Sequence, residues 1–164
     1  MEQTSPIKRH QALVALSRDH HFGLLLVWKI KQGLAKHVAL QRISSYVTYF
    51  FEHDLRAHFE EEETLLFPKL PADNPLRQRA EQEHRKIYEL VKKLQDDEPN
   101  KKLLEQFSDT LKEHIRFEER ELFTLVQQSL TDAELESLAI HDNSRSLQAD
   151  ANWYDVFWVN SEEK

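Results

Sequence analysis

Apolar residues recur at helical spacing in four long blocks of this chain. Within each block they are separated mostly by three or four residues, which places their side chains on one face of a helix. In the first block this face includes Leu16, Leu24 and Val27. The pattern predicts four amphipathic helices, at about residues 10–36, 38–67, 75–97 and 101–130.

Several residues mark where the predicted helices begin and end. Asn74 is a good helix cap, and Pro75 suits the first position of the helix that follows it. Thr131 and Glu134 have the spacing of a capping box, in which two side chains and two backbone N–H groups pair reciprocally. We therefore expect a short fifth helix that ends at about residue 140.

Four long helices with short connections predict an all-α fold, an antiparallel up-down four-helix bundle. With only two glycines the chain is poor in the turn residues that a β-rich fold requires. We assign residues 1–142 to the bundle and its fifth helix. Residues 143–164 form a polar C-terminal tail with an aromatic cluster, which we expect to dock on the bundle. Binding of a partner by this tail is the alternative.

Composition and charge exclude several classes of protein. Without cysteine there can be no disulfide, iron–sulfur cluster or thiolate zinc site. A formal net charge of −7 argues against a nucleic-acid partner. No apolar run approaches the roughly 20 residues that span a bilayer, and the N-terminus lacks the order of a signal peptide. We expect a cytoplasmic protein with neither membrane nor nucleic-acid contacts; its oligomeric state stays open.

Each of the four predicted helices carries a histidine on its apolar face. These are His20, His58, His84 and His114. Burying four imidazoles without partners costs several kcal/mol in total, so something must satisfy them. A metal ion can do so.

Two of these histidines precede a glutamate by four residues: His58 precedes Glu62, and His114 precedes Glu118. This offset turns a helix by only about 40°, so both groups of each pair project from one face. Imidazole and carboxylate together suit iron, manganese or zinc. With the two remaining histidines the chain offers six ligands, enough for a two-metal centre with bridging carboxylates and open coordination positions.

The two pairs belong to a longer repeat. In each half of the chain, a helix with an acid–histidine pair precedes a helix with the pattern His-xxx-Glu-Glu-xx-Leu-Phe. The segments are Asp19-His20 and His58–Phe67 in the first half, and Glu83-His84 and His114–Phe123 in the second. This repeat predicts a pseudo-twofold bundle with the metals near its axis.

In this order, the motifs resemble those of the hemerythrin-like (HHE cation-binding) domain over roughly residues 10–140. The resemblance implies a non-haem di-iron centre that binds dioxygen, senses oxygen, iron or redox state, or takes part in nitric-oxide chemistry. Carried over position by position, it implies that two irons are each held by two histidines and share two bridging glutamates. The metal ligands are then His20 and His58 on one iron, His84 and His114 on the other, and Glu62 and Glu118 as bridges.

The chain departs from the oxygen-carrying hemerythrins at two points. Where those proteins have a further histidine, four residues after the third-helix histidine, this chain has Tyr88. The second carboxylate is Glu118, whereas the carriers have an aspartate one residue later. Both changes put reversible oxygen carriage in doubt. Tyr88 either ligates ferric iron, leaves one iron more open, or simply packs in the core with a hydrogen-bonded hydroxyl.

Other polar or aromatic residues are assigned less central roles. His21 is the alternative to His20 as the first-helix ligand, and Glu63 and Glu119 either lie at the surface or support the ligands. Trp28 is expected in the core or in a pocket wall. Surface or packing roles are expected for His10, His37, His53 and His141.

Three functions fit these residues. The first is a di-iron protein that binds or senses dioxygen, nitric oxide or a related small ligand such as peroxide. The second is a di-iron oxidoreductase that turns over peroxide or nitric oxide with the same ligands. The third is a helical interaction module with a purely structural metal, for which zinc or no metal would be found. The residues favour the first, with manganese or zinc possible in place of iron.

Overall fold

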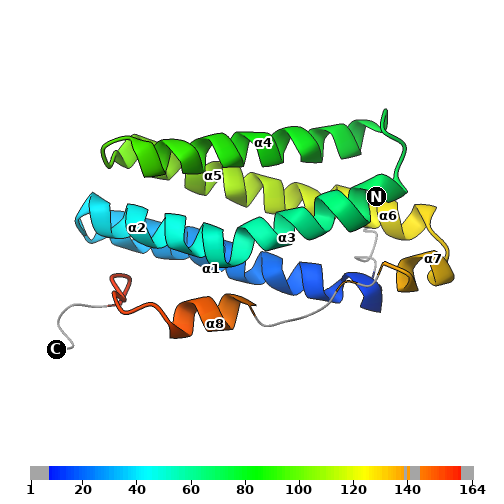
Figure 1. Cartoon of the computed structure of the whole chain (residues 1–164), viewed down its shortest axis with the longest axis horizontal. Helices are drawn as coiled ribbons and strands as arrows, with labels where there is room; N and C mark the ends of the chain where they lie inside the picture. Colours follow the sequence, from blue (N-terminus) through cyan, green and yellow to red (C-terminus); the bar gives the residue numbers. More distant parts are fainter. Residues whose placement is uncertain (1–7, 139, 141–144, 160–164) are drawn as a thin grey trace, which may run out of the picture.

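The computed structural model describes residues 8–138, 140 and 145–159, and nearly all of this part is helical (Figure 1). No β-strand occurs in this part of the chain, which confirms the all-α class. Within the same residues, none of the helices combines the length and the apolar character that crossing a membrane requires.

Helical segments cover the four predicted blocks. The α-helices are α1 (Val14–Ala35), α2 (Leu40–Phe50), α3 (Arg56–Glu61), α4 (Pro75–Asp96), α5 (Lys101–Phe117), α6 (Phe123–Ser129), α7 (Asp132–Glu136) and α8 (Arg145–Ala151). Short 3₁₀ turns lie at Gln11–Leu13 and Phe67–Lys69. Wider π-helical turns lie at Phe51–Leu55, Glu62–Leu66 and Glu118–Leu122. The second and fourth blocks are therefore continuous helical segments in which π turns join shorter α-helices.

The predicted helix starts are observed. The Asn74 side chain accepts hydrogen bonds from the backbone N–H groups of Leu76 and Arg77, at 2.9 and 3.1 Å. Thr131 and Glu134 form both hydrogen bonds of the capping box. Because α7 already ends at Glu136, however, the fifth helix is shorter than predicted.

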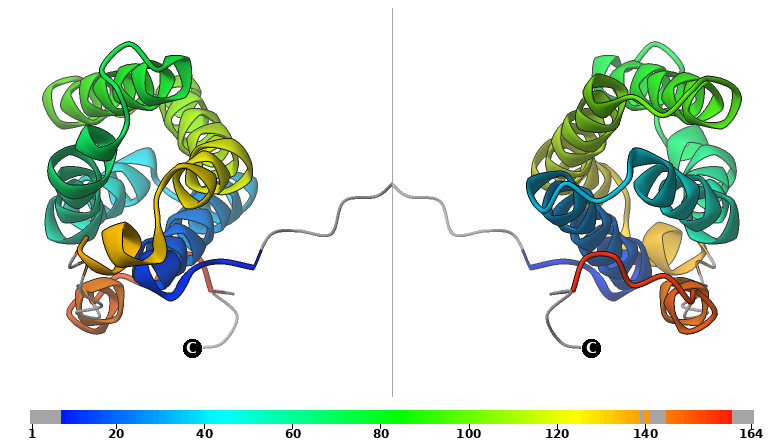
Figure 2. Two further views of the ribbon diagram at one scale, coloured as in Figure 1. Left: turned by 90° about the vertical axis from the view of Figure 1, so that its right-hand side faces the viewer. Right: turned by 90° about the vertical axis from the view of Figure 1, so that its left-hand side faces the viewer.

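Four long helical segments, formed by α1, α2–α3, α4 and α5–α6, lie side by side along the longest axis of the molecule (Figure 1). Viewed along that axis, α1, α2–α3, α4 and α5–α6 surround a common interior (Figure 2). Helix α1 packs closely on α5: a Cβ atom added at Gly23 would lie 2.7 Å from Ile115 Cδ1. The absence of a side chain at Gly23 thus allows the two helices to approach.

The interior holds two apolar clusters separated by polar residues. One cluster includes Leu26, Ile30, Phe50 and Leu111, and the other includes Leu16 and several residues near the opposite ends of the helices. In every long segment the predicted histidine falls between residues of the two clusters. The predicted ligands therefore lie across the middle of the bundle.

Part of the C-terminal tail contacts the bundle. It includes α8, a helix that the sequence did not predict, which lies outside the long segments in both views (Figures 1 and 2). Asp150 accepts hydrogen bonds from Lys29 Nζ (2.7 Å) and from Tyr46. Phe157 is buried in the first apolar cluster, whereas Tyr154 is 87% exposed.

For α1, the placement of Leu24 on the buried stripe and of Trp28 in the core was wrong, while a place for Trp28 in a pocket wall stays a prediction. Leu24 is 39% exposed and Trp28 is 47% exposed, so neither belongs to the core. They lie four residues apart on the outer edge of the helix. The apolar stripe of α1 is narrower than the sequence suggested, because the buried residues on this stretch are Leu26, Val27, Lys29 and Ile30 and do not include Leu24 or Trp28.

Candidate metal centre

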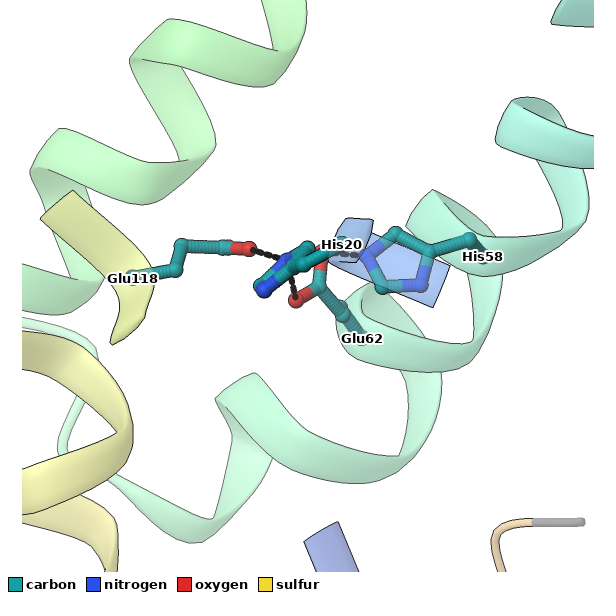
Figure 3. Close-up of side chains that lie close together, drawn as sticks. All are labelled: His20, His58, Glu62 and Glu118. Atoms are coloured by element: carbon teal, nitrogen blue, oxygen red, sulfur yellow. Dashed lines mark hydrogen bonds and ion pairs between the residues drawn. The ribbon is translucent and has the colours of Figure 1, made fainter. Parts of the chain in front are cut away.

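The six predicted ligands come together in the middle of the bundle. They form two groups, His20 and His58 with Glu62 and Glu118, and His84 and His114 with the same two glutamates. Within each group, one nitrogen or oxygen from every side chain lies within 4.8 Å of the others. All six side chains are buried. Figure 3 shows the first group, with the His20 ring between the two carboxylates.

Glu62 contacts histidines of both groups. Its Oε1 lies 3.1 Å from His84 Nε2, to which it is hydrogen-bonded, and 3.3 Å from His58 Nε2, its neighbour one turn earlier. Its Oε2 lies 3.9 Å from His20 Nε2. The carboxylate therefore stands between the histidines of the two groups.

Glu118 occupies the equivalent position from the other half of the chain. Its Oε1 lies 2.9 Å from His20 Nε2. Its Oε2 lies 3.3 Å from His114 Nε2 and 3.7 Å from His84 Nε2. Both glutamates thus link histidines from opposite halves of the bundle.

Four buried atoms of this cluster lack a hydrogen-bond partner: His58 Nε2, Glu62 Oε2, His114 Nε2 and Glu118 Oε2. Buried polar atoms are normally satisfied, and leaving one without a partner costs about 1–3 kcal/mol. Here all four belong to predicted ligands and include both carboxylates. A metal ion fits this need, since imidazole nitrogens and carboxylate oxygens are donors that it accepts together.

The other ring nitrogen of each histidine is held by a second carboxylate. The Nδ1 atoms of His20, His58, His84 and His114 lie 2.7, 3.0, 2.6 and 2.7 Å from Glu119, Asp19, Glu63 and Glu83, respectively. A hydrogen bond of this kind fixes the orientation of a ligating imidazole and strengthens it as a donor. The arrangement leaves every Nε2 directed towards the centre.

These four supporting carboxylates close a ring around the bundle. Each stands next in sequence to a predicted ligand of its own segment but supports the histidine of another. Asp19 on α1 contacts His58 on α3, and Glu63 contacts His84 on α4. Glu83 on α4 contacts His114 on α5, and Glu119 contacts His20 on α1, which closes the ring. The ring ties all four segments to the orientation of the histidines.

The electrostatics of the cluster also suit cations. Burial by itself lowers the pKa of His20, but its hydrogen bonds to Glu118 and Glu119 outweigh burial and raise that pKa to about 9. Burial likewise opposes the charged forms of His58 and His84, and neighbouring carboxylates again prevail and raise each pKa well above its ordinary value. The negative charge of the buried carboxylates thus favours positive charge on their neighbours. Protons on the histidines can supply that charge, and metal ions can supply it in their place.

The comparisons with known proteins agree with this geometry. Residues 8–126 match the family model of the hemerythrin HHE cation binding domain. The chain belongs to this family. The match confirms the resemblance stated from the sequence motifs. Comparisons with curated proteins and with solved structures found no match.

The hemerythrin-like domain of this chain uses π turns at both glutamates. The backbone N–H of Phe67 donates to Glu62 O, and that of Phe123 donates to Glu118 O, each across five residues. Such turns are rare and occur frequently at functional sites. Glu63 and Glu119, the residues directly after the predicted ligands, lie within these turns.

Among the described residues, the other histidines considered from the sequence lie away from the six predicted metal ligands. His20 belongs to the cluster, whereas His21 is exposed beside Phe22. His53 is exposed and lies against Tyr49 in a tilted ring contact, with ring centroids 4.3 Å apart. Histidines 10 and 37 are not in the cluster either, and residue 141 lies outside the described residues.

Sequence reasoning missed the role of Asp19 and Glu83. Both entered only as members of acid–histidine pairs, although each supports a histidine on a different helix. Their position directly before a predicted ligand is the signal that could have revealed them. Tyr88 donates a hydrogen bond to Glu63 Oε2 at 3.1 Å, so its hydroxyl has a protein partner.

Proposed function

We propose that this protein is a non-haem di-iron protein that binds or senses dioxygen, nitric oxide or a related small redox ligand. The observation that carries this proposal is the pair of four-residue groups that share Glu62 and Glu118. Two metal ions would account for this overlap, with His20 and His58 holding one, His84 and His114 the other, and Glu62 and Glu118 available to both. In this proposal the four long segments act as an antiparallel up-down bundle, and the protein works in the cytoplasm.

The burial of the cluster supports a small ligand. None of the six side chains is more than 4% exposed. A ligand that reaches the centre must pass between packed helices, which favours a molecule of two or three atoms over an organic substrate. When bound, iron would supply the redox chemistry and the affinity for such ligands.

The protein contributes orientation and exclusion of water. The ring of Asp19, Glu63, Glu83 and Glu119 holds each imidazole with Nε2 inward. Phe123 stacks on His20 and Phe59 stacks on His84, with ring centroids 5.1 and 4.1 Å apart. A rigid, apolar surround of this kind limits solvent access to a metal site and controls its redox properties.

A single spectroscopic experiment tests the proposal. The protein is loaded with ferrous iron under anaerobic conditions, and its iron content and absorption spectrum are measured before and after exposure to air. We expect two irons per chain and a new near-ultraviolet and visible band. The lifetime of the band then distinguishes a binding or sensing protein from an oxidoreductase, which would restore the reduced spectrum repeatedly when given an electron donor.

The matched control is the zinc-loaded protein, which cannot change oxidation state. A protein that binds zinc but not iron, or shows no band after air, would contradict the proposal. That result would favour a helical module with a structural metal.

A further inference from the structure

Three of the supporting carboxylates, Glu63, Glu83 and Glu119, differ in the groups that contact them besides a histidine. Glu119 receives a hydrogen bond from Ser17 Oγ (2.9 Å) and lies 3.6 Å from the Arg9 guanidinium. Glu83 receives one from Arg79 Nε at 2.9 Å. Behind Glu63, by contrast, is the neutral hydroxyl of Tyr88. The two halves of the pseudo-twofold cluster are therefore not equivalent beyond the histidines.

Tyr88 and His84 converge on the same oxygen. Glu63 Oε2 lies 2.6 Å from His84 Nδ1 and accepts a hydrogen bond from the Tyr88 hydroxyl at 3.1 Å. Tyr88 follows His84 by one helical turn on α4, which places both side chains on one face of the helix. Burial raises the pKa of Tyr88 above its ordinary value, so the phenol keeps its proton and remains a donor.

The ring of Tyr88 is held in place by aromatic neighbours. Its centroid lies 5.7 Å from those of Phe51 and Phe59, both in edge contacts. The Arg56 guanidinium lies 5.9 Å from the same centroid. Because the ring is fixed on several sides, its hydroxyl is a rigid anchor.

Glu63, in contrast, borders solvent. Its side chain is 35% exposed. Together with Tyr88, Arg56 and Lys92 it lines a surface groove of about 490 Å³. Without the Tyr88 hydroxyl, the carboxylate can rotate into this groove, where water competes for its oxygens.

We propose that Tyr88 is a positioning residue, which anchors Glu63 and thereby sets the orientation and donor strength of His84. It acts on one of the two metal positions and not on the other. The inference rests on the proposed function only in that His84 ligates a metal. The hydrogen-bond chain from Tyr88 through Glu63 to His84 Nδ1 involves protein atoms alone.

The first test uses Tyr88→Phe in metal-free protein, where only the hydroxyl is lost. In long-range ¹H–¹⁵N spectra of the histidine rings, we expect the His84 Nδ1 proton to shift and to exchange faster with water. The signals of His20 and His58 should stay in place. Tyr49→Phe is the matched control, because Tyr49 OH donates to a tail carbonyl, that of Ala149, and not to the cluster.

The second test is calorimetric titration with Co²⁺ alone. Outer hydrogen-bond partners of metal ligands are typically worth about 10–100-fold in affinity, and Tyr88 lies one hydrogen bond further out. We expect Tyr88→Phe to weaken one of two binding steps by roughly 3–10-fold. The other step should not change. In a Glu63→Ala background Tyr88→Phe should have no further effect, because the anchored group is gone.

Three results would overturn the role of Tyr88: no change at His84, equal weakening of both steps, or an undiminished effect in the Glu63→Ala background. A phenolate absorption band in ferric protein that disappears in Tyr88→Phe would also overturn it, since Tyr88 would then be a ligand. Failure of Co²⁺ and iron to bind at all would count against the proposed function. The spectra of metal-free protein would still decide the role of Tyr88.

Discussion

At the scale of single residues, the environment of a histidine decides what it can do. His58 is 1% exposed, and its Nε2 faces Glu62 at 3.3 Å without forming a hydrogen bond. His53, five residues earlier, is exposed to solvent and its ring contacts that of Tyr49. Two imidazoles of the same segment thus have unrelated surroundings. Metal binding should depend on the first and not on the second.

Replacing a cluster histidine should remove metal. We expect His58→Ala or His114→Ala to lower bound iron by about half or more, because each change takes away one of the two imidazoles of its group. Metal analysis of the loaded and desalted protein measures this. His53→Ala is the control and should retain the iron content of the unmodified chain. Equal losses in all three variants would show that the assignment is wrong.

The pKa of His20 predicts how the metal-free protein responds to alkali. Since folding raises that pKa from 6.5 to about 9, the stabilising proton is fully bound below pH 6.5 and lost as the pH rises through about 9. Burial by itself would raise the pKa of Glu118, but His114, His20 and His84 together outweigh burial and lower this pKa well below 4.5. The stabilisation from Glu118 is therefore present above pH 4.5 and lost in acid.

We therefore expect the free energy of unfolding of metal-free protein to be greatest between about pH 4.5 and 6.5. The decline towards pH 9 should amount to a few kcal/mol, on the order of 3 for His20 alone. Urea unfolding at a series of pH values measures it. Metal-loaded protein should lack the alkaline decline, because its imidazoles are already deprotonated. Constant stability from pH 6 to 9 without metal would contradict this.

At the scale of helices, two glycines set how closely neighbours approach. A Cβ atom at Gly33 would lie 2.8 Å from both Ile43 Cδ1 on α2 and Phe157 Cε1 in the tail. At Gly23 the only atom within 3 Å would be Ile115 Cδ1, the movable end of one side chain. The same substitution should therefore have different costs at these two positions of α1.

Gly33→Ala should destabilise the protein by about 1–2 kcal/mol, because crowding against two side chains at once, one of them an aromatic ring, exceeds the gain in helix propensity of about 1 kcal/mol. Gly23→Ala should lie within about 1 kcal/mol of the unmodified protein. Urea unfolding of both variants decides the matter. A Gly33→Ala variant as stable as Gly23→Ala would show that the tail yields easily at Phe157.

At the scale of the whole molecule, a buried charge connects the tail to the bundle. Lys29 is 4% exposed, and its ammonium group lies 2.7 Å from Asp150, 3.0 Å from Tyr46 OH and 4.1 Å from the centroid of the Trp158 ring. A buried ammonium needs a counter-charge, and Asp150 is the carboxylate that pairs with it. The division into a bundle of residues 1–142 and a docked tail of residues 143–164 remains a proposal that this contact supports.

Removing Asp150 should therefore cost more than removing a surface ion pair. We expect Asp150→Ala to lower the free energy of unfolding by about 2–3 kcal/mol, since Lys29 is left buried with its charge unpaired. Arg42→Ala breaks the exposed pair with Asp155 and should cost less than about 1 kcal/mol. Urea unfolding compares the two variants, and both should keep their iron content. Equal costs would mean that Lys29 finds water or another partner.

Much of this molecule is determined locally by the sequence. The helical spacing of apolar residues, the caps at Asn74 and Thr131, and the two His-xxx-Glu pairs all depend on residues within one or two turns of each other. That is why the all-α class, the helix blocks and the six clustered residues could be predicted without a structure.

Only the tertiary structure decided the contacts between segments. Whether Glu63 or Glu119 reaches a histidine depends on the position of the neighbouring helix, which a helical period does not reveal. The same holds for Trp28, which is exposed because the neighbours of α1 do not cover its side of the helix. It holds also for Lys29, whose partner Asp150 lies 121 residues away in the sequence. Hydrophobic spacing predicts which face of a helix is apolar, but packing decides which polar groups become partners across it.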